Sequence, residues 1–129
     1  MTTTVEQAVS ALEQRYPSEL ASDWDAVGLV CGDPAATVQH VLFAVDPVLS
    51  VVDEALAVGA DMIVAHHPLF LHGVHSVAPT TPTGRVVHTL ISHGIALYCA
   101  HTNADHARPG VSDALAEACG PSATTALDP

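Results

Sequence analysis

The sequence predicts an α/β fold with a mostly parallel sheet and helices on both faces. Short, continuously apolar segments at 41–45, 62–65 and 96–100 alternate with segments in which apolar residues recur at helical spacing. Continuous apolar runs are typical of strands that are covered on both faces of a parallel sheet. The chain has 129 residues, of which 49% are hydrophobic and only 4% aromatic. We therefore expect one domain whose core is built from Val, Leu, Ile and Ala.

Four helices are expected along the chain. They cover about 5–15, Val48 to Leu56, Val86 to Ile91 and about 111–119. Thr4 and Gln7 have the spacing of a capping box at the start of the first helix. Asp46 follows a strand and precedes the second helix, so it is interpreted as the N-cap of that helix. Gly59 is expected to end the second helix as the residue after its C-cap.

The C-terminal part of the chain is expected to close the domain. In the last helix, Leu115 and Ala118 are predicted to face inward, and Gly120 ends the helix. The α/β metal-binding domain is therefore expected to span 1–120, with 121–129 as a linker. The segment 69–82 is a long connection for a compact domain, which indicates a functional loop or a subunit contact.

Composition excludes several classes of function. The net charge is −11 and only three residues are basic, so a nucleic-acid-binding surface with clustered Lys and Arg is not expected. No apolar run reaches about 18 residues, so no membrane span is expected. The N-terminus lacks the pattern of a signal peptide, and a cytoplasmic location is the expectation. Three cysteines without paired spacing are interpreted as small buried side chains at Cys31, Cys99 and Cys119.

The nine histidines are the unusual feature of the sequence, and two of them are adjacent. His66 and His67 follow an apolar strand, and Pro68 disfavours helical backbone at His67. Neighbouring side chains of a strand point to opposite faces, so each imidazole could serve a different ion of a close pair. The alternative, one functional histidine and one hydrogen-bonded core histidine, is equally open.

A second strand, 96–100, ends in the same way. His101 follows it directly, and Asp105 lies a few residues further along. Ligands bind at the carboxyl ends of strands in open α/β sheets, so Asp105 could share an ion with His66 or His67. His101 could bind the ion, or it could orient a ligand through its ring N–H. Two ions would need further ligands, and the candidates in this chain are Asp46, His72, His75 and His106. His40, His88 and His93 are interpreted as structural or surface groups.

Three motifs resemble those of a known family. They are Trp24 to Pro34 (WDAVGLVCGDP), His66 to Phe70 (HHPLF) and Ala100 to Asp105 (AHTNAD). Their order and spacing resemble the dinuclear-metal-centre proteins called GTP cyclohydrolase 1 type 2 homologs, also named after the yeast Ngg-interacting factor three. The resemblance extends over nearly the whole chain. Ala26 departs from it, because the family usually has asparagine there.

The resemblance implies a site with two divalent ions. His66 and His67 each look like a ligand to one ion, and Asp105 looks like a further ligand to the His66 ion. The family's other ligands are a histidine and a bridging glutamate near the C-terminus, in a part that this sequence does not resemble. The chain therefore looks like the N-terminal half of a two-part metal-binding fold, in which the second ion would bind weakly or not at all. Imidazole with carboxylate suits Zn, Fe, Mn, Co or Ni.

Two functions follow from the resemblance as expectations. The first is a metal-dependent hydrolase that opens the ring of a purine nucleotide, as GTP cyclohydrolases do, with His101 as the catalytic proton carrier. The second is a non-catalytic, metal-dependent scaffold or regulatory protein. In both cases the resemblance implies a ring-like homo-oligomer, a hexamer, with divalent metal as the partner common to both.

Overall fold

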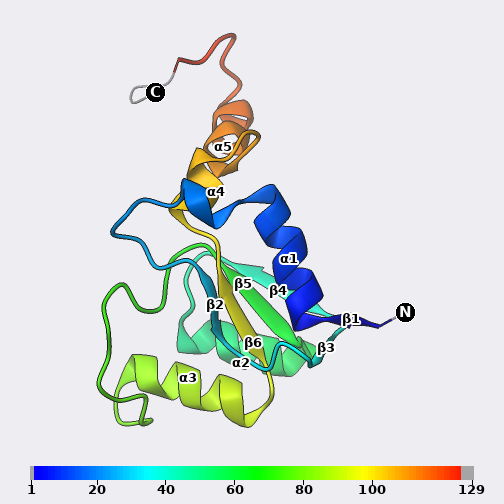
Figure 1. The fold of residues 1–129 in the computed structure, drawn as a ribbon, viewed down its shortest axis with the longest axis vertical. Helices are drawn as coiled ribbons and strands as arrows, with labels where there is room; N and C mark the ends of the chain where they lie inside the picture. The colour runs from blue at the N-terminus through cyan, green and yellow to red at the C-terminus, as the bar shows by residue number, and fades with distance from the viewer. Residues whose placement is uncertain (1, 126–129) are drawn as a thin grey trace.

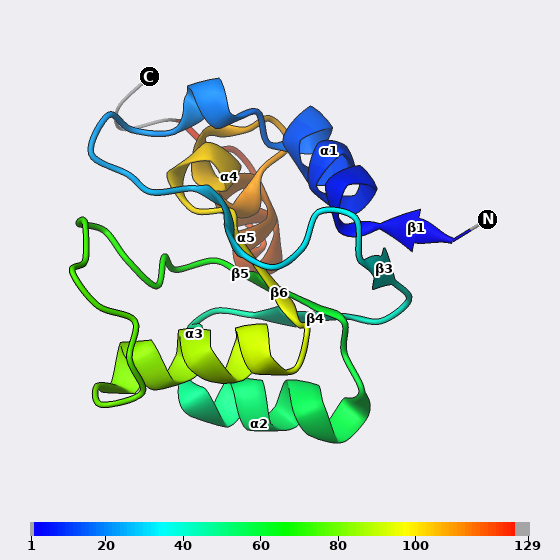
Figure 2. The same ribbon diagram turned by 60° about the horizontal axis from the view of Figure 1, so that its bottom comes forward.

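The computed structural model describes residues 2–125 and contains a four-stranded sheet between helices (Figure 1). The elements in order are β1 (Thr3–Thr4), α1 (Val5–Arg15), η1 (Ser18–Leu20, a 3₁₀ helix), β2 (Gly28–Cys31), β3 (Thr37–Val38), β4 (Val41–Ala44), α2 (Leu49–Val58), β5 (Met62–Ala65), α3 (Pro82–Ser92), β6 (Ala96–Cys99), α4 (Thr102–His106) and α5 (Val111–Cys119). Figure 2 shows α2 and α3 together on one face of the sheet and α1 on the other. β1 and β3 pair with each other as a separate two-stranded sheet.

The main sheet has the strand order β2-β6-β5-β4. β4, β5 and β6 are parallel, whereas β2 pairs antiparallel with β6. The predicted mostly parallel α/β fold is therefore confirmed, with one antiparallel edge strand. β2 and β6 are far apart in the sequence, so the local sequence around β2 does not show that it runs antiparallel to β6.

The core consists of two clusters separated by the sheet, because side chains alternate between its faces along each strand. On the α2/α3 face, Ile63 and Leu97 pack with the helix residues Val52 and Leu90. On the α1 face, the neighbouring strand residues Met62, Val64, Ala96 and Tyr98 pack with Val5, and Ala8 and Val9 border this cluster. All residues of β5 and β6 are buried, which agrees with their uninterrupted apolar sequence.

The ends of α1 and α2 test the predicted caps. Thr4 and Gln7 form the predicted capping box at the start of α1. Gly59 ends α2 in the left-handed conformation with φ +68°, as predicted. The prediction for Asp46 is wrong: the N-cap of α2 is Val48, which makes no side-chain capping bond. Asp46 lies further from the helix and has another partner, described below.

The edge strand β2 depends on a glycine for its close approach to β6. The register shifts between Leu29 and Cys31, which marks a bulge. Gly32 follows with φ +117°, and a Cβ atom built there would lie 2.6 Å from the Cβ atom of Ala96. Only glycine fits this position without moving β2 away from β6.

The C-terminal elements differ from their predictions. α4 occupies a segment for which no helix was predicted, and α5 projects from the body of the molecule in Figure 1. Leu115 is 66% exposed and Ala118 is also exposed, so their predicted inward orientation is wrong. Cys119 is exposed and Cys31 half-buried, so only Cys99 fits the predicted burial of all three cysteines. Of the expected linker, 121–125 contain no helix or strand and 126–129 lie outside the described residues.

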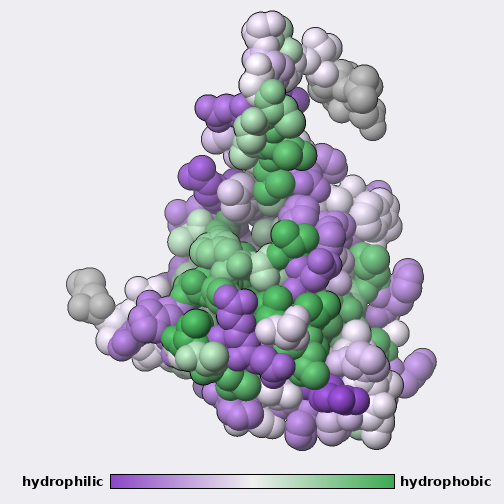
Figure 3. Space-filling view, turned by 180° about the vertical axis from the view of Figure 1, so that it is seen from behind, coloured by the Kyte–Doolittle hydropathy of each residue, from purple (hydrophilic) through white to green (hydrophobic). Residues whose placement is uncertain are grey.

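Apolar side chains of the other edge strand, β4, and of the residue after it reach the surface. Val41 and Phe43 of β4 and the following Val45 are exposed, because the helix on the α1 face packs on β5 and β6 and leaves β4 uncovered. Figure 3 shows hydrophobic residues (green) interspersed with hydrophilic ones (purple) on the rear of the molecule and continuing into the projection at its top. None of the helices within 2–125 is long and apolar enough to cross a membrane.

Candidate metal centre

The candidate site lies where the three parallel strands end. Ala44, Ala65 and Cys99 are aligned across β4, β5 and β6 at their carboxyl ends. The segments that follow them carry Asp46, the pair His66 and His67, and His101. Each strand thus delivers at least one polar side chain to the same edge of the sheet.

The antiparallel strand β2 adds a further carboxylate to this edge. Its first residue, Gly28, pairs with Cys99 near the end of β6. Because β2 runs in the opposite direction, the residues that precede it lie where the parallel strands end. Asp25 therefore reaches the site from a segment far away in the sequence.

Three imidazoles gather at this edge. One ring nitrogen of each of His66, His67 and His101 lies within 4.8 Å of those of the other two. The ring centroids are 5.3 Å apart for His66 and His67, 5.2 Å for His66 and His101, and 5.7 Å for His67 and His101. Such a spacing is compatible with three nitrogen ligands of one cation. Among the residues that the structure describes, this is the group with the donors and the spacing of a metal site.

The hydrogen bonds of the three rings define which nitrogen is free. Nδ1 of His66 donates to the carbonyl oxygen of Ala100 (2.9 Å), Nδ1 of His67 donates to Asp46 (2.7 Å), and Nδ1 of His101 donates to Asp25 (3.0 Å). Carbonyl and carboxylate oxygens accept hydrogen bonds, so each Nδ1 carries the proton. Nε2 of each ring is then left with a lone pair. Metal-binding histidines in proteins commonly have this arrangement.

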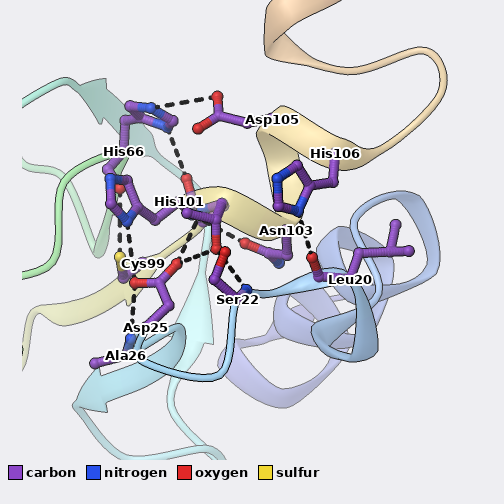
Figure 4. A network of polar contacts seen from close by, with 12 residues as sticks. Leu20, Ser22, Asp25, Ala26, His66, Cys99, His101, Asn103, Asp105 and His106 are labelled. Carbon is purple, nitrogen blue, oxygen red and sulfur yellow. Dashed lines mark hydrogen bonds and ion pairs between the residues drawn. The ribbon is translucent and has the colours of Figure 1, made fainter. Parts of the chain in front are cut away.

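The pair formed by His101 and Asp25 is the buried one. The side chain of Asp25 has 0% exposure and that of His101 17%. Asp25 also accepts a hydrogen bond from the backbone N–H of Ala26 (2.7 Å), which Figure 4 shows beside the contact with His101. It accepts two more from Thr102, one from the backbone N–H (3.0 Å) and one from the hydroxyl. Burial alone would raise the pKa of Asp25, but the hydrogen bonds from Thr102, His101 and the backbone outweigh it and lower the pKa to about 2.

The pair formed by His67 and Asp46 lies at the surface. The two side chains are 48% and 59% exposed, although their contact of 2.7 Å is shorter than that of the buried pair. This contact explains why Asp46 does not cap α2, since its carboxylate is engaged by the imidazole. The same two residue types thus meet on both sides of the cluster, in different environments.

Asp105 lies close to His66, as the resemblance implied. One carboxylate oxygen is 3.6 Å from Nε2 of His66, which is the ring nitrogen that has no hydrogen-bond donor role. Asp105 is carried by the short helix α4, directly after the end of β6 (Figure 4). These two atoms could provide one nitrogen ligand and one oxygen ligand to the same cation.

The donor set fits one divalent cation better than two. The group consists of three imidazoles, and Asp105 lies outside it but adjoins it at His66 (3.6 Å), so it could add an oxygen ligand to a four-coordinate site. A second ion would need further ligands, and the remaining candidates also lie outside this group. His106 instead bonds through Nδ1 to the carbonyl oxygen of Leu20 (2.8 Å), and His72 and His75 are exposed in the 69–82 loop.

The histidines interpreted as surface groups lie away from the site. His40, His88 and His93 are all exposed. His40 and His93 use Nδ1 for contacts to backbone oxygens of Gly59 and Thr89, at 3.3 Å and 2.8 Å. These contacts fix local turns and the end of α3.

Sequence reasoning missed two residues that position the site. Asp25 and Asn103 lie within the motifs that resemble the family, but neither was given a role of its own. The buried Asn103 side chain accepts a hydrogen bond from the backbone N–H of His101 (2.9 Å) and donates to the carbonyl oxygen of Tyr16 (2.8 Å). It therefore ties the segment after β6 to the end of α1. The nearby ring of Trp24 lies edge-on to His101, with centroids 6.0 Å apart.

Two curated proteins with similar sequences carry the same name. The chain is 59% identical over 112 residues to the GTP cyclohydrolase 1 type 2 homolog of Streptomyces coelicolor, covering 87% of this chain and 39% of that protein. It is 50% identical over 129 residues to the homolog of Mycobacterium tuberculosis, covering 100% of this chain and 34% of that protein. The chain thus spans little more than a third of the length of these relatives.

Solved structures agree with this similarity. The NIF3-related protein of Bacillus cereus matches with a TM-score of 0.93 and 40% identity, over 99% of this chain and 36% of that one. HcgD from Methanocaldococcus jannaschii, in its reduced form, matches with a TM-score of 0.83 and 32% identity, over 91% of this chain and 47% of that one. The family model described as Duf34/NIF3 (NGG1p interacting factor 3) matches residues 3–129. With the fold, the motifs and the family model in agreement, the chain belongs to the Duf34/NIF3 family.

Proposed function

We propose that this chain binds a divalent metal ion through Nε2 of His66, His67 and His101, with Asp105 as an oxygen ligand. One observation carries the proposal: all three Nδ1 atoms donate to oxygen, which leaves the Nε2 lone pair free on each of three histidines that lie in one small group. Imidazole is a favoured ligand of Zn, Fe, Co and Ni, and carboxylate also suits Mn. In this proposal His101 is a ligand, which is one of the roles that its position after the strand suggested, in place of the role as proton carrier that the expected hydrolase gave it.

The roles of the residues around the ligands follow from their contacts. Asp25 holds His101 in the tautomer with a protonated Nδ1 and increases the basicity of its Nε2. Asp46 does the same for His67, and the carbonyl oxygen of Ala100 does so for His66. A bound divalent ion supplies Lewis acidity, which polarises a substrate oxygen or nitrogen and favours ionisation of water near neutral pH. The chemistry proposed for the whole protein is therefore metal-dependent hydrolysis.

The substrate class proposed for the whole protein is a purine nucleotide. Curated relatives carry the name GTP cyclohydrolase 1 type 2 homolog, and such a reaction opens the imidazole ring of the purine by hydrolysis. Net charge disfavours a nucleotide at most of this surface, since the chain carries −11. A metal ion would reverse that field locally, which makes the metal centre the natural place for an anionic substrate.

Metal binding can be tested with single alanine substitutions. We expect His66→Ala, His67→Ala and His101→Ala each to weaken zinc binding at least about tenfold, because each removes a ligand. Asp105→Ala is expected to weaken it less. The matched control is His88→Ala, since His88 is an exposed histidine on α3. Metal content after dialysis, together with competition against a chelator of known affinity, measures the effect.

The proposal for the site is wrong if all three histidine variants retain zinc as the unsubstituted protein does. Hydrolytic function is tested separately, by release of formate from GTP in the presence of zinc, iron, manganese, cobalt or nickel. Metal binding without release of formate would support the metal centre and contradict the proposed hydrolytic function.

A second candidate function is a metal-dependent assembly module. The observation that favours it is the exposure of apolar residues on β4 and α5, Phe43 and Leu115 among them. Exposed apolar residues of this kind are typical of protein–protein interfaces. A ring-like homo-oligomer would bury such surface. The mass of the particle in solution, measured with metal and after chelation, distinguishes an assembly that needs the metal from one that does not.

A further inference from the structure

A cavity of about 320 Å³ adjoins the candidate metal centre. It lies between the segment that joins β4 to α2, the segment that follows β5, and the first turns of α3. His67 and Asp46 line it, together with the apolar side chains of Val48, Leu69 and Val86 and with Arg85. Its volume is within the range of small-molecule sites, which starts at roughly 300 Å³.

The cavity and the metal centre share a residue. His67 lines the cavity, and its Nδ1 donates to Asp46, which lines the cavity too. A molecule in the cavity would therefore be in contact with the imidazole that we assign to the metal ion. This adjacency makes the cavity a candidate for the part of a substrate that does not react.

Arg85 gives the cavity a cationic wall. It is one of only three basic residues in a chain with net charge −11. Every ion pair within 2–125 joins a histidine to an aspartate, so Arg85 is engaged in none of them. The first turn of α3, which also lines the cavity, contains no acidic residue. The N-terminal end of the helix adds a partial positive charge on the same side.

The remaining walls favour an organic body over an inorganic ion. Val48, Leu69 and Val86 present methyl groups, and three prolines, Pro47, Pro68 and Pro82, restrict the backbone around them. The one acidic lining residue, Asp46, is engaged by Nδ1 of His67. Arg85 is therefore the charged group of the lining that has no ion-pair partner within 2–125, and rigid apolar walls beside it suit a molecule with an apolar body and one anionic end. Arginine binds phosphate and carboxylate groups through paired N–H donors.

We propose that this cavity is the anion-recognition subsite of the metal centre, and that Arg85 binds a phosphate or carboxylate group of the substrate. The proposal rests on the proposed function, because the reacting part of the substrate would lie at the metal ion beside His67. It assigns Arg85 to specificity and to substrate positioning, with no part in the chemical step. It also identifies how a strongly acidic chain could accept an anionic substrate.

The test uses three small probes of similar shape: phenyl phosphate, benzoate and the neutral benzyl alcohol. Binding of each is measured by calorimetry to the zinc-loaded protein and to the zinc-free protein. The variants are Arg85→Met, which keeps the length of the side chain, and Arg85→Lys, which keeps the charge. Arg15→Met is the matched control, because Arg15 is an exposed arginine at the end of α1.

We expect Arg85→Met to weaken binding of an anionic probe at least about tenfold, as loss of a paired charged contact does. Arg85→Lys should recover part of it, and neither variant should change benzyl alcohol binding. If Arg85→Met weakens the binding of phenyl phosphate only, Arg85 recognises a phosphate group. If it weakens the binding of benzoate only, Arg85 recognises a carboxylate group. Val48→Trp, which fills the cavity with a larger side chain, should weaken all three probes.

Two results would overturn the proposal. One is unchanged binding of both anions by Arg85→Met, and the other is no binding of either anion at millimolar concentration by the zinc-loaded protein. Zinc content is measured for every variant first, which separates this test from that of the metal centre. An Arg85-dependent effect in the zinc-free protein would support the subsite even where zinc binding fails.

Discussion

Two histidine–aspartate pairs flank the candidate metal centre, and they differ mainly in burial. His101 and Asp25 lie in the interior, where the carboxylate is inaccessible and accepts hydrogen bonds from Thr102 and Ala26 as well. His67 and Asp46 lie at the surface, where water competes for the same groups. The distances alone, 3.0 Å and 2.7 Å, would rank the surface pair as the stronger. Burial and the number of donors reverse this ranking, because an interior charge without its partners is costly.

The largest expected effect follows from loss of the buried carboxylate. Asp25→Ala leaves Nδ1–H of His101 and the two donors of Thr102 without their acceptor in the interior. We expect the free energy of unfolding to fall by about 3 kcal/mol, the range for breaking a buried charged network. Zinc binding should weaken by about 10- to 100-fold, because His101 loses its fixed orientation.

Urea unfolding of the metal-free protein and zinc titration measure the two effects of Asp25→Ala separately. Asp23→Ala is the matched control, since Asp23 is exposed two residues away. A stability equal to that of the control would show that the interior network contributes little, and the comparison would lose its basis.

The rate at which a thiol reagent labels Cys99 measures how often the structure around His101 and Asp25 opens locally. Burial raises the pKa of Cys99 to about 12, with a further contribution from the Asp25 carboxylate. Cys119 is exposed, so a thiol reagent should label it first and leave Cys99 unreacted in the native protein. In Asp25→Ala, we expect Cys99 to react on the order of tenfold faster, since local opening limits its labelling. Mass spectrometry of labelled peptides gives the rate, and equal Cys99 rates in both proteins would contradict the expectation.

A third aspartate, Asp61, shows how backbone hydrogen bonds alter the pKa of a carboxyl group whose side chain is not hydrogen-bonded to a histidine ring. The backbone N–H groups of His40 and Gln39, at 2.9 Å and 2.7 Å from Asp61, lower its pKa from the ordinary value of 3.8. A carboxyl whose pKa is lower in the folded state stabilises the fold above its unfolded pKa, and this contribution is lost as the pH falls through the folded pKa.

Asp61→Asn should therefore lower the free energy of unfolding by about 1 kcal/mol at pH 7, which is less than a hydrogen bond to a buried charge contributes because solvent screens this half-buried carboxylate. The difference from the unsubstituted protein should shrink as the pH falls below about 4. Urea midpoints at several pH values measure this. A difference that stays constant down to pH 2 would assign the effect to packing instead of charge.

The smallest expected effect belongs to the surface pair. Asp46→Asn keeps the size of the side chain and removes its charge, and exposed ion pairs contribute about 0–1 kcal/mol. We expect unfolding free energy to change by less than about 0.5 kcal/mol and zinc affinity by less than in Asp25→Ala. A loss of stability as large as that of Asp25→Ala would show that exposure does not separate the two pairs.

Local sequence patterns predicted much of the fold. Alternation of apolar runs with helical spacing predicted the parallel strands and the helices between them. The positions of His66, His67 and Asp105 shortly after two of these strands predicted that they lie at one edge of the sheet. The location of Asp25 could not be predicted in this way, because it precedes β2, and the antiparallel direction of β2 depends on its pairing with β6. Asp46 was assigned to a helix cap because capping is a local preference, whereas its actual partner, His67, lies 21 residues away.

The C-terminal elements show a second limit of sequence patterns. Helical spacing correctly predicted α5, and it identified Leu115 as part of an apolar face. The spacing carries no information on whether another element covers that face, and here it is exposed. The short helix α4 was missed because its five residues are too few to show a period.

The central claim is that three imidazoles bind the metal ion through Nε2 while their Nδ1 atoms remain protonated. Long-range proton–nitrogen NMR spectra of the imidazole rings, recorded before and after addition of zinc, test it directly. We predict that Nε2 of His66, His67 and His101 shifts on zinc binding, that their Nδ1 atoms stay protonated, and that His88 is unchanged. Unchanged Nε2 signals at saturating zinc, or loss of the Nδ1 protons, would contradict the claim.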